Sequence, residues 1–178
     1  MHPKLILFCA YPVTGKTELA TYMERELGFA RVDWDKIAKE SEIYDPSKVP
    51  KGYDFRDEAF RRTLTERDQH LSQNKDVVID SPATDVFSRE RLLDTNTRCQ
   101  KYTIVIEIPK RFHLKLLRKR CPDAIFGLEA VYEIQEGAWW ADPIYDKISS
   151  EIIRLRNWYF GSLSSMKRKI RRTLENST

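Results

Sequence analysis

Cysteine and histidine are scarce in this chain of 178 residues. It contains three cysteines and three histidines, which are Cys9, Cys99, Cys121, His2, His70 and His113. Their wide scatter matches no zinc-site spacing and gives no grounds for a Cys–His nucleophile. An odd, scattered set of cysteines is typical of reduced thiols in a cytoplasmic protein, not of a disulfide framework.

Long hydrophobic runs are also absent. The longest apolar stretch, residues 5–10, is too short for a membrane span or for the core of a signal peptide, so we expect neither membrane insertion nor secretion. With 41% hydrophobic and 33% charged residues, the composition is typical of a folded globular chain. The length favours one domain.

Positive charge is concentrated near the C-terminus. The chain has 31 basic and 27 acidic residues, and residues 152–174 include seven basic residues and no acidic one. Such a segment indicates either a polyanionic partner, with nucleic acid as the candidate, or a solvated helix face. Apolar residues from Ile148 to Leu174 recur at steps of three and four, which predicts one long amphipathic helix or two helices broken near 157–161.

Strand and helix patterns alternate along the rest of the chain. This alternation predicts an α/β domain with a mainly parallel sheet flanked by helices. Strands are expected at 4–10, 30–32, 76–79 and 102–108, and helices at 15–27, 54–72, 88–98, 110–120 and 125–137.

The strongest motif is AYPVTGKT at residues 10–17. It matches the phosphate-loop pattern G-x-x-x-x-G-K-[ST], with Ala10 in place of the first glycine, between an apolar strand and a helical pattern. We expect Lys16 to contact nucleotide phosphates and Thr17 to ligate Mg²⁺. Many such loops have glycine where Val13 stands. Backbone N–H groups of the loop and the helix N-terminus hold the phosphates, so the nucleotide-binding candidates are Pro12, Val13, Thr14, Gly15, Lys16 and Thr17.

Carboxylates follow two of the expected strands. Asp33 and Asp35 come after the second strand, and Asp80 comes after the apolar run 77–79. The carboxyl ends of parallel strands face the ligand crevice. Asp35 is therefore a candidate general base for an attacking hydroxyl, or else the cap of a helix beginning near Lys36. Asp80 is a candidate Mg²⁺ ligand of the Walker B kind, or else a turn residue before the following Ser-Pro.

Basic residues cluster on the helix expected at 110–120. Arg118 and Arg120 lie nearest its end, before a break at residues 121–122. A guanidinium that closes over the γ-phosphate stabilises the charge that develops in phosphoryl transfer. The catalytic candidates are therefore Lys16, Asp35, Arg118 and Arg120. For each arginine the alternative is a solvated helix face.

In their order along the chain, these features resemble the P-loop kinase family that includes the phage-type polynucleotide 5′-kinases and the zeta-toxin kinases. The resemblance covers residues 4–145 and rests on YPVTGKT, VDWD, VVID followed by SRERLL, and IVIEIPKRFHLKLLRKR. It implies a three-layer α/β kinase that uses ATP and Mg²⁺, with the general base at Asp35 and the lid arginine at Arg118 or Arg120. Polynucleotide kinases of this family have an acceptor-binding arginine three residues after the base, where this chain has Ala38, followed by Lys39.

The sequence thus predicts an ATP-dependent P-loop phosphotransferase with a hydroxyl acceptor. That acceptor is either a nucleic-acid 5′-hydroxyl or a small molecule such as a sugar, nucleoside or antibiotic, and the missing arginine at position 38 slightly favours the small molecule. The same residues are also compatible with a nucleotide-binding switch that has no acceptor, or with a nucleotide kinase. Residues 1–145 are expected to form the kinase core with a small lid near 110–125, and residues 146–178 a basic amphipathic helix packed on it.

Overall fold

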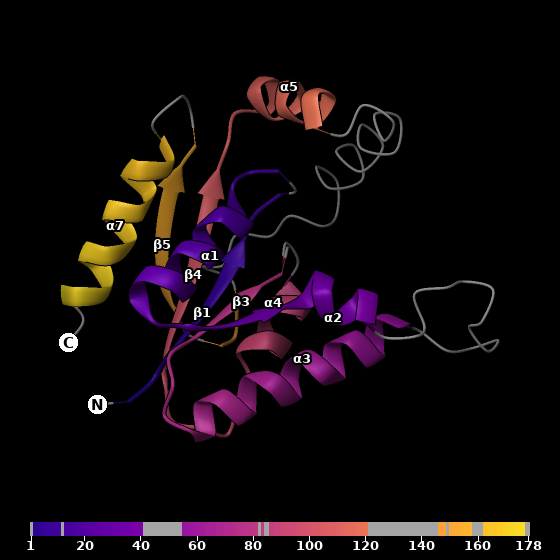
Figure 1. The fold of residues 1–178 in the computed structure, drawn as a ribbon, viewed down its shortest axis with the longest axis vertical. Helices are drawn as coiled ribbons and strands as arrows, with labels where there is room; N and C mark the ends of the chain where they lie inside the picture. The colour runs from indigo at the N-terminus through magenta and orange to yellow at the C-terminus, as the bar shows by residue number, and fades with distance from the viewer. Residues whose placement is uncertain are drawn as a thin grey trace.

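A five-stranded parallel sheet forms the centre of the computed structural model, which describes residues 2–11, 13–40, 55–81, 83, 86–120, 146–148, 150–157 and 162–176 (Figure 1). The strand order is β2-β3-β1-β4-β5, and every neighbouring pair is parallel. The prediction of an α/β fold with a parallel sheet flanked by helices is confirmed. The strands are β1 (Lys4–Cys9), β2 (Ala30–Asp33), β3 (Val77–Asp80), β4 (Gln100–Glu107) and β5 (Glu151–Arg156).

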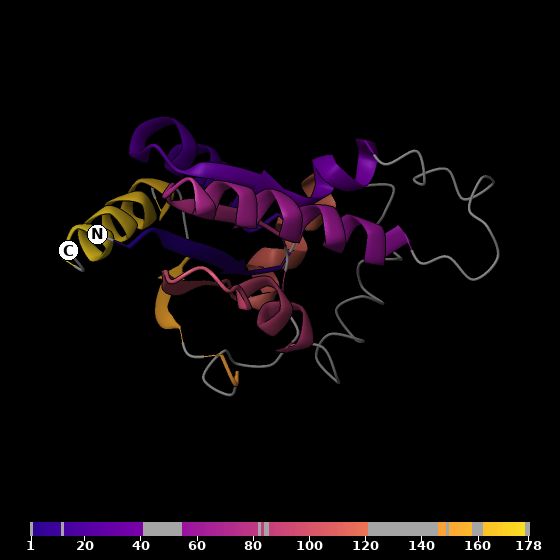
Figure 2. The same cartoon turned by 90° about the horizontal axis from the view of Figure 1, so that it is seen from below.

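Helices connect and cover these strands. The helices of the described residues are α1 (Lys16–Leu27), α2 (Trp34–Glu40), α3 (Phe55–Ser72), α4 (Val86–Leu93), α5 (Lys110–Arg120) and α7 (Ser162–Asn176). Gly28 ends α1 in a left-handed conformation (φ 76°), which fits the stop expected there. Helix α2 lies against α3, and α5 lies across the carboxyl ends of the strands (Figures 1 and 2).

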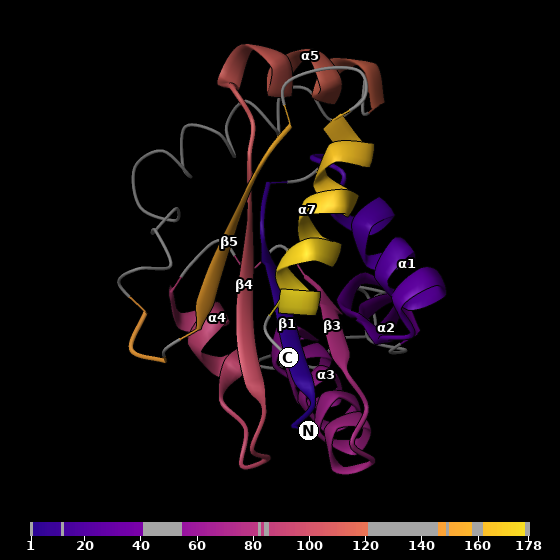
Figure 3. The same cartoon turned by 90° about the vertical axis from the view of Figure 1, so that its left-hand side faces the viewer.

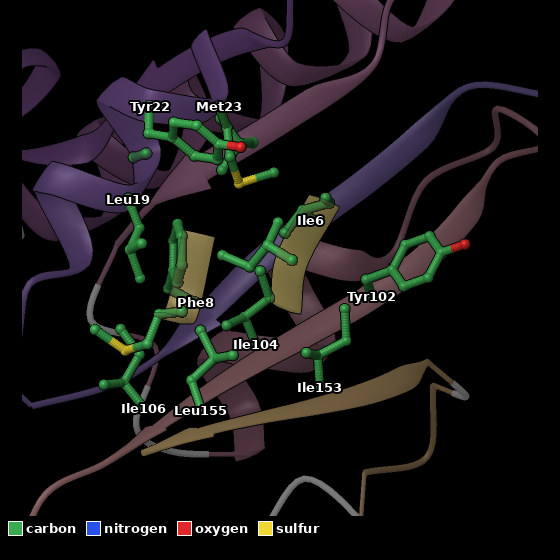
Figure 4. Close-up of a cluster of buried hydrophobic side chains, with 14 of the residues drawn as sticks. Ile6, Phe8, Leu19, Tyr22, Met23, Tyr102, Ile104, Ile106, Ile153 and Leu155 are labelled. Atoms are coloured by element: carbon green, nitrogen blue, oxygen red, sulfur yellow. The ribbon is translucent and has the colours of Figure 1, made fainter. Parts of the chain in front are cut away.

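Alternate side chains of each strand pack against helices on opposite faces of the sheet, which gives the three-layer arrangement. Ile6 and Phe8 of β1 join a cluster with α1, β4, β5 and α7 (Figure 4). Leu5 and Leu7 point the other way and pack with β3, α2, α3 and α4. Helices α1 and α7 contact each other on the first face (Figure 3). Each fully buried side chain of this size contributes about 1.5–3 kcal/mol.

The C-terminal segment differs from the prediction. The expected helical turns between residues 148 and 156 are wrong, because Glu151–Arg156 forms the edge strand β5 beside β4. Its side chains alternate, with Ile153 and Leu155 buried, and adjacent β-branched isoleucines favour a strand. The helical spacing holds only in α7, which buries Met166, Ile170 and Leu174.

Other boundaries shift by smaller amounts. Helix α4 ends at Leu93, although the pattern predicts helix to residue 98. The helix expected at 125–137 and the end of the expected lid, 121–125, lie outside the described residues. Among the residues that are described, none of the helices is long and apolar enough to cross a membrane. The described ends of the chain lie close together, with Lys4 Nζ donating to the Leu174 carbonyl at 2.9 Å (Figures 1 and 2).

Candidate active site

The sheet topology brings the phosphate-loop motif and Asp80 to the same edge of the sheet. Strands β1 and β3 are neighbours, but α1 follows β1 onto one face of the sheet, and α4 follows β3 onto the other. Ligands of open parallel sheets bind at such a switch, outside the carboxyl ends of the strands. The phosphate loop follows β1, and β3 ends at Asp80. Residues 64 positions apart therefore meet at the expected place.

The phosphate loop contains two residues in the left-handed conformation. Gly15 (φ 96°) precedes the first turn of α1, and Val13 has φ 55°. A β-branched residue is rare in that region, so Val13 holds a conformation that glycine would adopt without strain. The buried Thr14 hydroxyl donates to the Tyr11 carbonyl at 2.8 Å and fixes the loop internally. Pro12 lies outside the described residues.

Asn157 anchors the phosphate loop from the end of β5. Its Nδ2 donates to the Thr14 carbonyl at 2.7 Å, and its own backbone N–H donates to the Glu107 carbonyl at 2.9 Å. Sequence reasoning missed this residue, because β5 was not recognised as a strand. Had it been, a polar residue directly after a parallel strand would have been a candidate for this edge of the sheet.

Four charged side chains form a connected group behind the loop, which we call the Asp80 network: Lys16, Arg31, Asp33 and Asp80. Lys16 Nζ lies 2.9 Å from Asp80 Oδ1. Arg31 NH2 donates to Asp80 Oδ2 and to Asp33 Oδ2, both at 2.7 Å. Lys16 is 9% exposed and Asp80 only 3%. Asp80 is therefore paired with two cations, one of which, Arg31, the sequence analysis did not single out.

Asp33, not Asp35, caps α2. The helix begins at Trp34, and the backbone N–H of Lys36 donates to Asp33 Oδ1 at 3.0 Å. The alternative role of Asp35 as the helix cap is therefore wrong. Asp35 lies in the first turn of α2 with its side chain exposed. Ala38, one turn later, is 2% exposed and packs inward.

Two residues at the loop and at the end of β3, Thr17 and Asp80, carry oxygen atoms of the kind that Mg²⁺ binds. Thr17 is exposed in the first turn of α1, beside Lys16, which contacts Asp80. A hydroxyl and a carboxylate are the oxygen ligands that Mg²⁺ combines with substrate phosphates. The described residues contain no group of three or more His, Cys, Asp or Glu side chains that would hold a metal ion. The fit therefore depends on Thr17, Asp80 and a phosphate ligand together.

An aromatic pair connects α5 with the phosphate loop. The rings of Tyr11 and His113 lie 5.4 Å apart, and His113 is buried. Arg118 is exposed on the same helix. Arg120 ends α5, but its side chain lies outside the described part. The structure thus brings the helix of the expected lid arginines to the loop, and their placement over a nucleotide stays a prediction.

A second buried charge pair, Arg89–Asp146, lies on the α4 side of the sheet. Arg89 donates to both carboxylate oxygens of Asp146 at 2.7 Å and to the Ala83 carbonyl at 3.3 Å. The Arg89 guanidinium also lies 3.6 Å from the buried Cys9 sulfur. At a separate cysteine, Cys99, which directly precedes β4, burial raises the pKa of the thiol and disfavours the thiolate form.

Comparison with solved structures finds the same fold in several kinases. A gluconokinase from Sinorhizobium meliloti matches with a TM-score of 0.65 and 15% identity over 98% of this chain and 95% of its own. The APS kinase CysC of Mycobacterium tuberculosis, in complex with AMPPNP and APS, matches at 0.63 and 15% identity over 98% of both chains. A chain of the Pnkp1/Rnl/Hen1 complex matches at 0.51 and 19% identity over 67% of this chain and 39% of its own. No protein-family model and no curated protein matches the chain.

Proposed function

We propose that this protein is an ATP-dependent kinase that transfers the γ-phosphoryl group of ATP to a hydroxyl acceptor. The observation that carries the proposal is the 2.9 Å contact between Lys16 Nζ and Asp80 Oδ1 at the switch between β1 and β3. P-loop phosphotransferases use a loop lysine to hold the phosphates and a nearby carboxylate to hold Mg²⁺. The likeness of the whole chain to a gluconokinase and an APS kinase supports the same chemistry.

The phosphate-binding role falls on the loop and the start of α1. Lys16 and the loop amides would hold the β- and γ-phosphates, and the left-handed Gly15 turns the backbone into the helix N-terminus. Thr17 and Asp80 would hold Mg²⁺, which when bound offsets phosphate charge and orients the transferred group. Arg118 is our candidate for the lid arginine, with Arg120 as the second.

Asp35 is our candidate general base. Because Asp33 already caps α2, the exposed Asp35 carboxylate remains available to an acceptor. It would accept the hydroxyl proton as the acceptor oxygen bonds to the γ-phosphorus and the bond to the ADP oxygen breaks. Asp33 pairs with Asp80 in the strand register, so α2 begins beside the end of β3, which supports this role for Asp35.

A small polyhydroxylated molecule is the acceptor that we favour. The buried Ala38 stands where polynucleotide kinases of the family have their acceptor-binding arginine, so this position offers no cation to an acceptor phosphate. The gluconokinase matches over nearly the whole chain, whereas the chain of the Pnkp1/Rnl/Hen1 complex matches over two thirds of it.

A nucleic-acid 5′-hydroxyl is the second candidate. Helix α7 packs its apolar side on the core and exposes a basic face, which we define as Arg168, Lys169, Arg171 and Arg172. A basic face of this kind attracts polyanions at low salt. The acceptor assay separates the two candidates directly.

The test is a transfer assay with γ-³²P-ATP against sugars, sugar acids, nucleosides, aminoglycosides and 5′-hydroxyl DNA and RNA. We expect label on a sugar or sugar acid, and a loss of about 10²-fold or more in Asp35→Asn, the size of a lost general base. Glu40→Gln is the matched control, because Glu40 is an exposed carboxylate on the same helix. ATP binding without transfer to any acceptor would instead favour a nucleotide-binding switch.

A further inference from the structure

The two cations around Asp80 contact different oxygens of its carboxylate. Lys16 Nζ contacts Oδ1 at 2.9 Å, and Arg31 NH2 donates to Oδ2 at 2.7 Å. With 3% of its surface exposed, Asp80 has almost no water to solvate its charge. A buried carboxylate in this position needs charged or hydrogen-bonding partners.

If Lys16 binds phosphates, its one positive charge interacts with two anionic groups, the phosphates and the Asp80 carboxylate. Its ammonium is a mobile point charge on a flexible stem, and a polyphosphate draws that charge away from Asp80. Asp80 then keeps Arg31 as its partner among these side chains, beside any Mg²⁺ that it would hold. The position of Arg31 is more restricted, because it belongs to strand β2 and its NH1 also donates to Thr21 Oγ1 of α1 at 3.2 Å.

Arg31 also joins three elements of the site. Arg31 and Asp33 are two residues apart on β2, so their side chains lie on the same face of the sheet. Asp33 lies opposite Asp80 in the strand register. The Arg31 guanidinium therefore connects Asp80 of β3 with Asp33, the residue that caps α2. Arg31 Nε is buried and lacks a hydrogen-bond partner among the described residues. The side chain therefore leaves one donor unsatisfied while it contacts both carboxylates, which is costly for a purely structural contact.

We propose that Arg31 is a positioning residue of the phosphate site, which holds Asp80 in place and offsets its charge while Lys16 binds nucleotide phosphates. This inference rests on the proposed function, because it needs Lys16 to bind phosphates. An arginine that only stabilised the fold would leave the nucleotide affinity of the folded protein unchanged.

The test is calorimetric titration with Mg²⁺–ATP, at a temperature where circular dichroism shows each variant folded. Arg31→Gln should weaken the affinity by about tenfold or more, because Lys16 would then be drawn more strongly to Asp80 and be less available to the phosphates. Arg31→Lys should lose less Mg²⁺–ATP affinity than Arg31→Gln. The lysine ammonium restores the positive charge, but it cannot reach Asp33, Asp80 and Thr21 together. Arg25→Gln, which removes an exposed charge from the last turn of α1, should bind like the wild type.

The outcomes separate the role of Arg31 from the proposed function. A folded Arg31→Gln variant with wild-type affinity would overturn the role of Arg31 and leave the proposed function standing. If Arg31→Gln does not fold, Arg31→Lys decides: a loss of several-fold supports the inference, and unchanged affinity overturns it. A wild-type protein that binds no Mg²⁺–ATP would overturn the proposed function and this inference together.

Discussion

The Asp80 network and the Arg89–Asp146 pair are both buried ionic groups, but they differ in how completely their charges are satisfied. Arg89 and Asp146 form two parallel hydrogen bonds of 2.7 Å, and their side chains are 0% and 1% exposed. In the Asp80 network, Lys16 has a single contact with Asp80, next to the exposed Thr17. The charges of Arg89 and Asp146 are therefore fully paired with each other, whereas the Asp80 network includes a cation, Lys16, that can change partners.

This difference indicates different roles for two groups of similar chemistry. A closed bidentate pair fixes geometry, and breaking it leaves an uncompensated buried charge. A lysine with one carboxylate contact beside a phosphate loop can offer its charge to a ligand. We therefore expect Arg89 to matter for stability and Lys16 for nucleotide chemistry, and the following changes test that contrast.

The largest expected effect comes from Arg89→Met. It should lower the free energy of unfolding by about 3–5 kcal/mol, because Asp146 is left buried without its partner. Chemical denaturation measures this loss. The double variant Arg89→Met/Asp146→Leu should recover much of it, since two apolar side chains replace the pair. A single variant as stable as the wild type would show that the pair is not structural.

Lys16→Ala should have the next largest effect, on activity. We expect phosphate transfer to fall by about 10³-fold or more, which corresponds to about 4 kcal/mol of transition-state stabilisation. The free energy of unfolding should fall by less than about 1.5 kcal/mol, because Arg31 still pairs with Asp80. A folded variant with normal turnover would contradict the phosphate-loop interpretation.

The sequence pointed to Lys16 and Asp80, but neither to their partner Arg31 nor to the Arg89–Asp146 pair. The GKT motif and the aspartate after an apolar run identified Lys16 and Asp80, because both signals are local. Arg31 acquires its role only when the register sets Asp33 opposite Asp80. Asn157 depends in the same way on β4–β5 pairing.

The wrong prediction of helical turns between residues 148 and 156 has a related cause. In the segment that forms β5, Ile152 and Leu155 continue the spacing of three and four residues that α7 keeps, so a short edge strand mimics helix turns. Pairing with β4, which lies far away in the sequence, determines the outcome. Asp33 and Asp35 were confused as helix caps because boundaries differ by a residue or two.

Asp35→Asn should have an intermediate effect. Transfer should fall by about 10²-fold, or about 2.7 kcal/mol, while Mg²⁺–ATP affinity stays within about twofold of the wild type. Steady-state rates at saturating ATP, compared with calorimetric affinities, separate the two quantities. Normal transfer would leave Asp35 as an exposed residue of the first helical turn without a chemical role.

Val13→Gly should have a small stabilising effect. Glycine removes the strain of a β-branched residue at φ 55°, which outweighs its larger chain entropy in the unfolded state by about 0.5–1 kcal/mol. Thermal unfolding measures the gain. Val13→Ala is the matched control, because alanine keeps the Cβ atom and should bring no such gain. A Val13→Gly variant less stable than Val13→Ala would contradict the strain.

The smallest effect is expected on α7. Replacing the exposed Arg168, Lys169 and Arg172 with Gln should change stability by less than about 0.5 kcal/mol and leave Mg²⁺–ATP affinity unaltered. If nucleic acid is the acceptor, the slope of log oligonucleotide affinity against log salt should flatten by up to about three units. An altered Mg²⁺–ATP affinity would show that α7 acts on the phosphate site itself.

One measurement tests the contrast most directly: the Mg²⁺–ATP affinity of the wild type, Lys16→Ala and Arg89→Met, titrated at a temperature where all three are folded. We predict that the wild type binds, that Lys16→Ala loses affinity by about tenfold or more, and that Arg89→Met binds normally despite its lower stability. Equal affinities in the wild type and Lys16→Ala, or no binding by the wild type, would contradict the assignment of the Asp80 network to nucleotide phosphates.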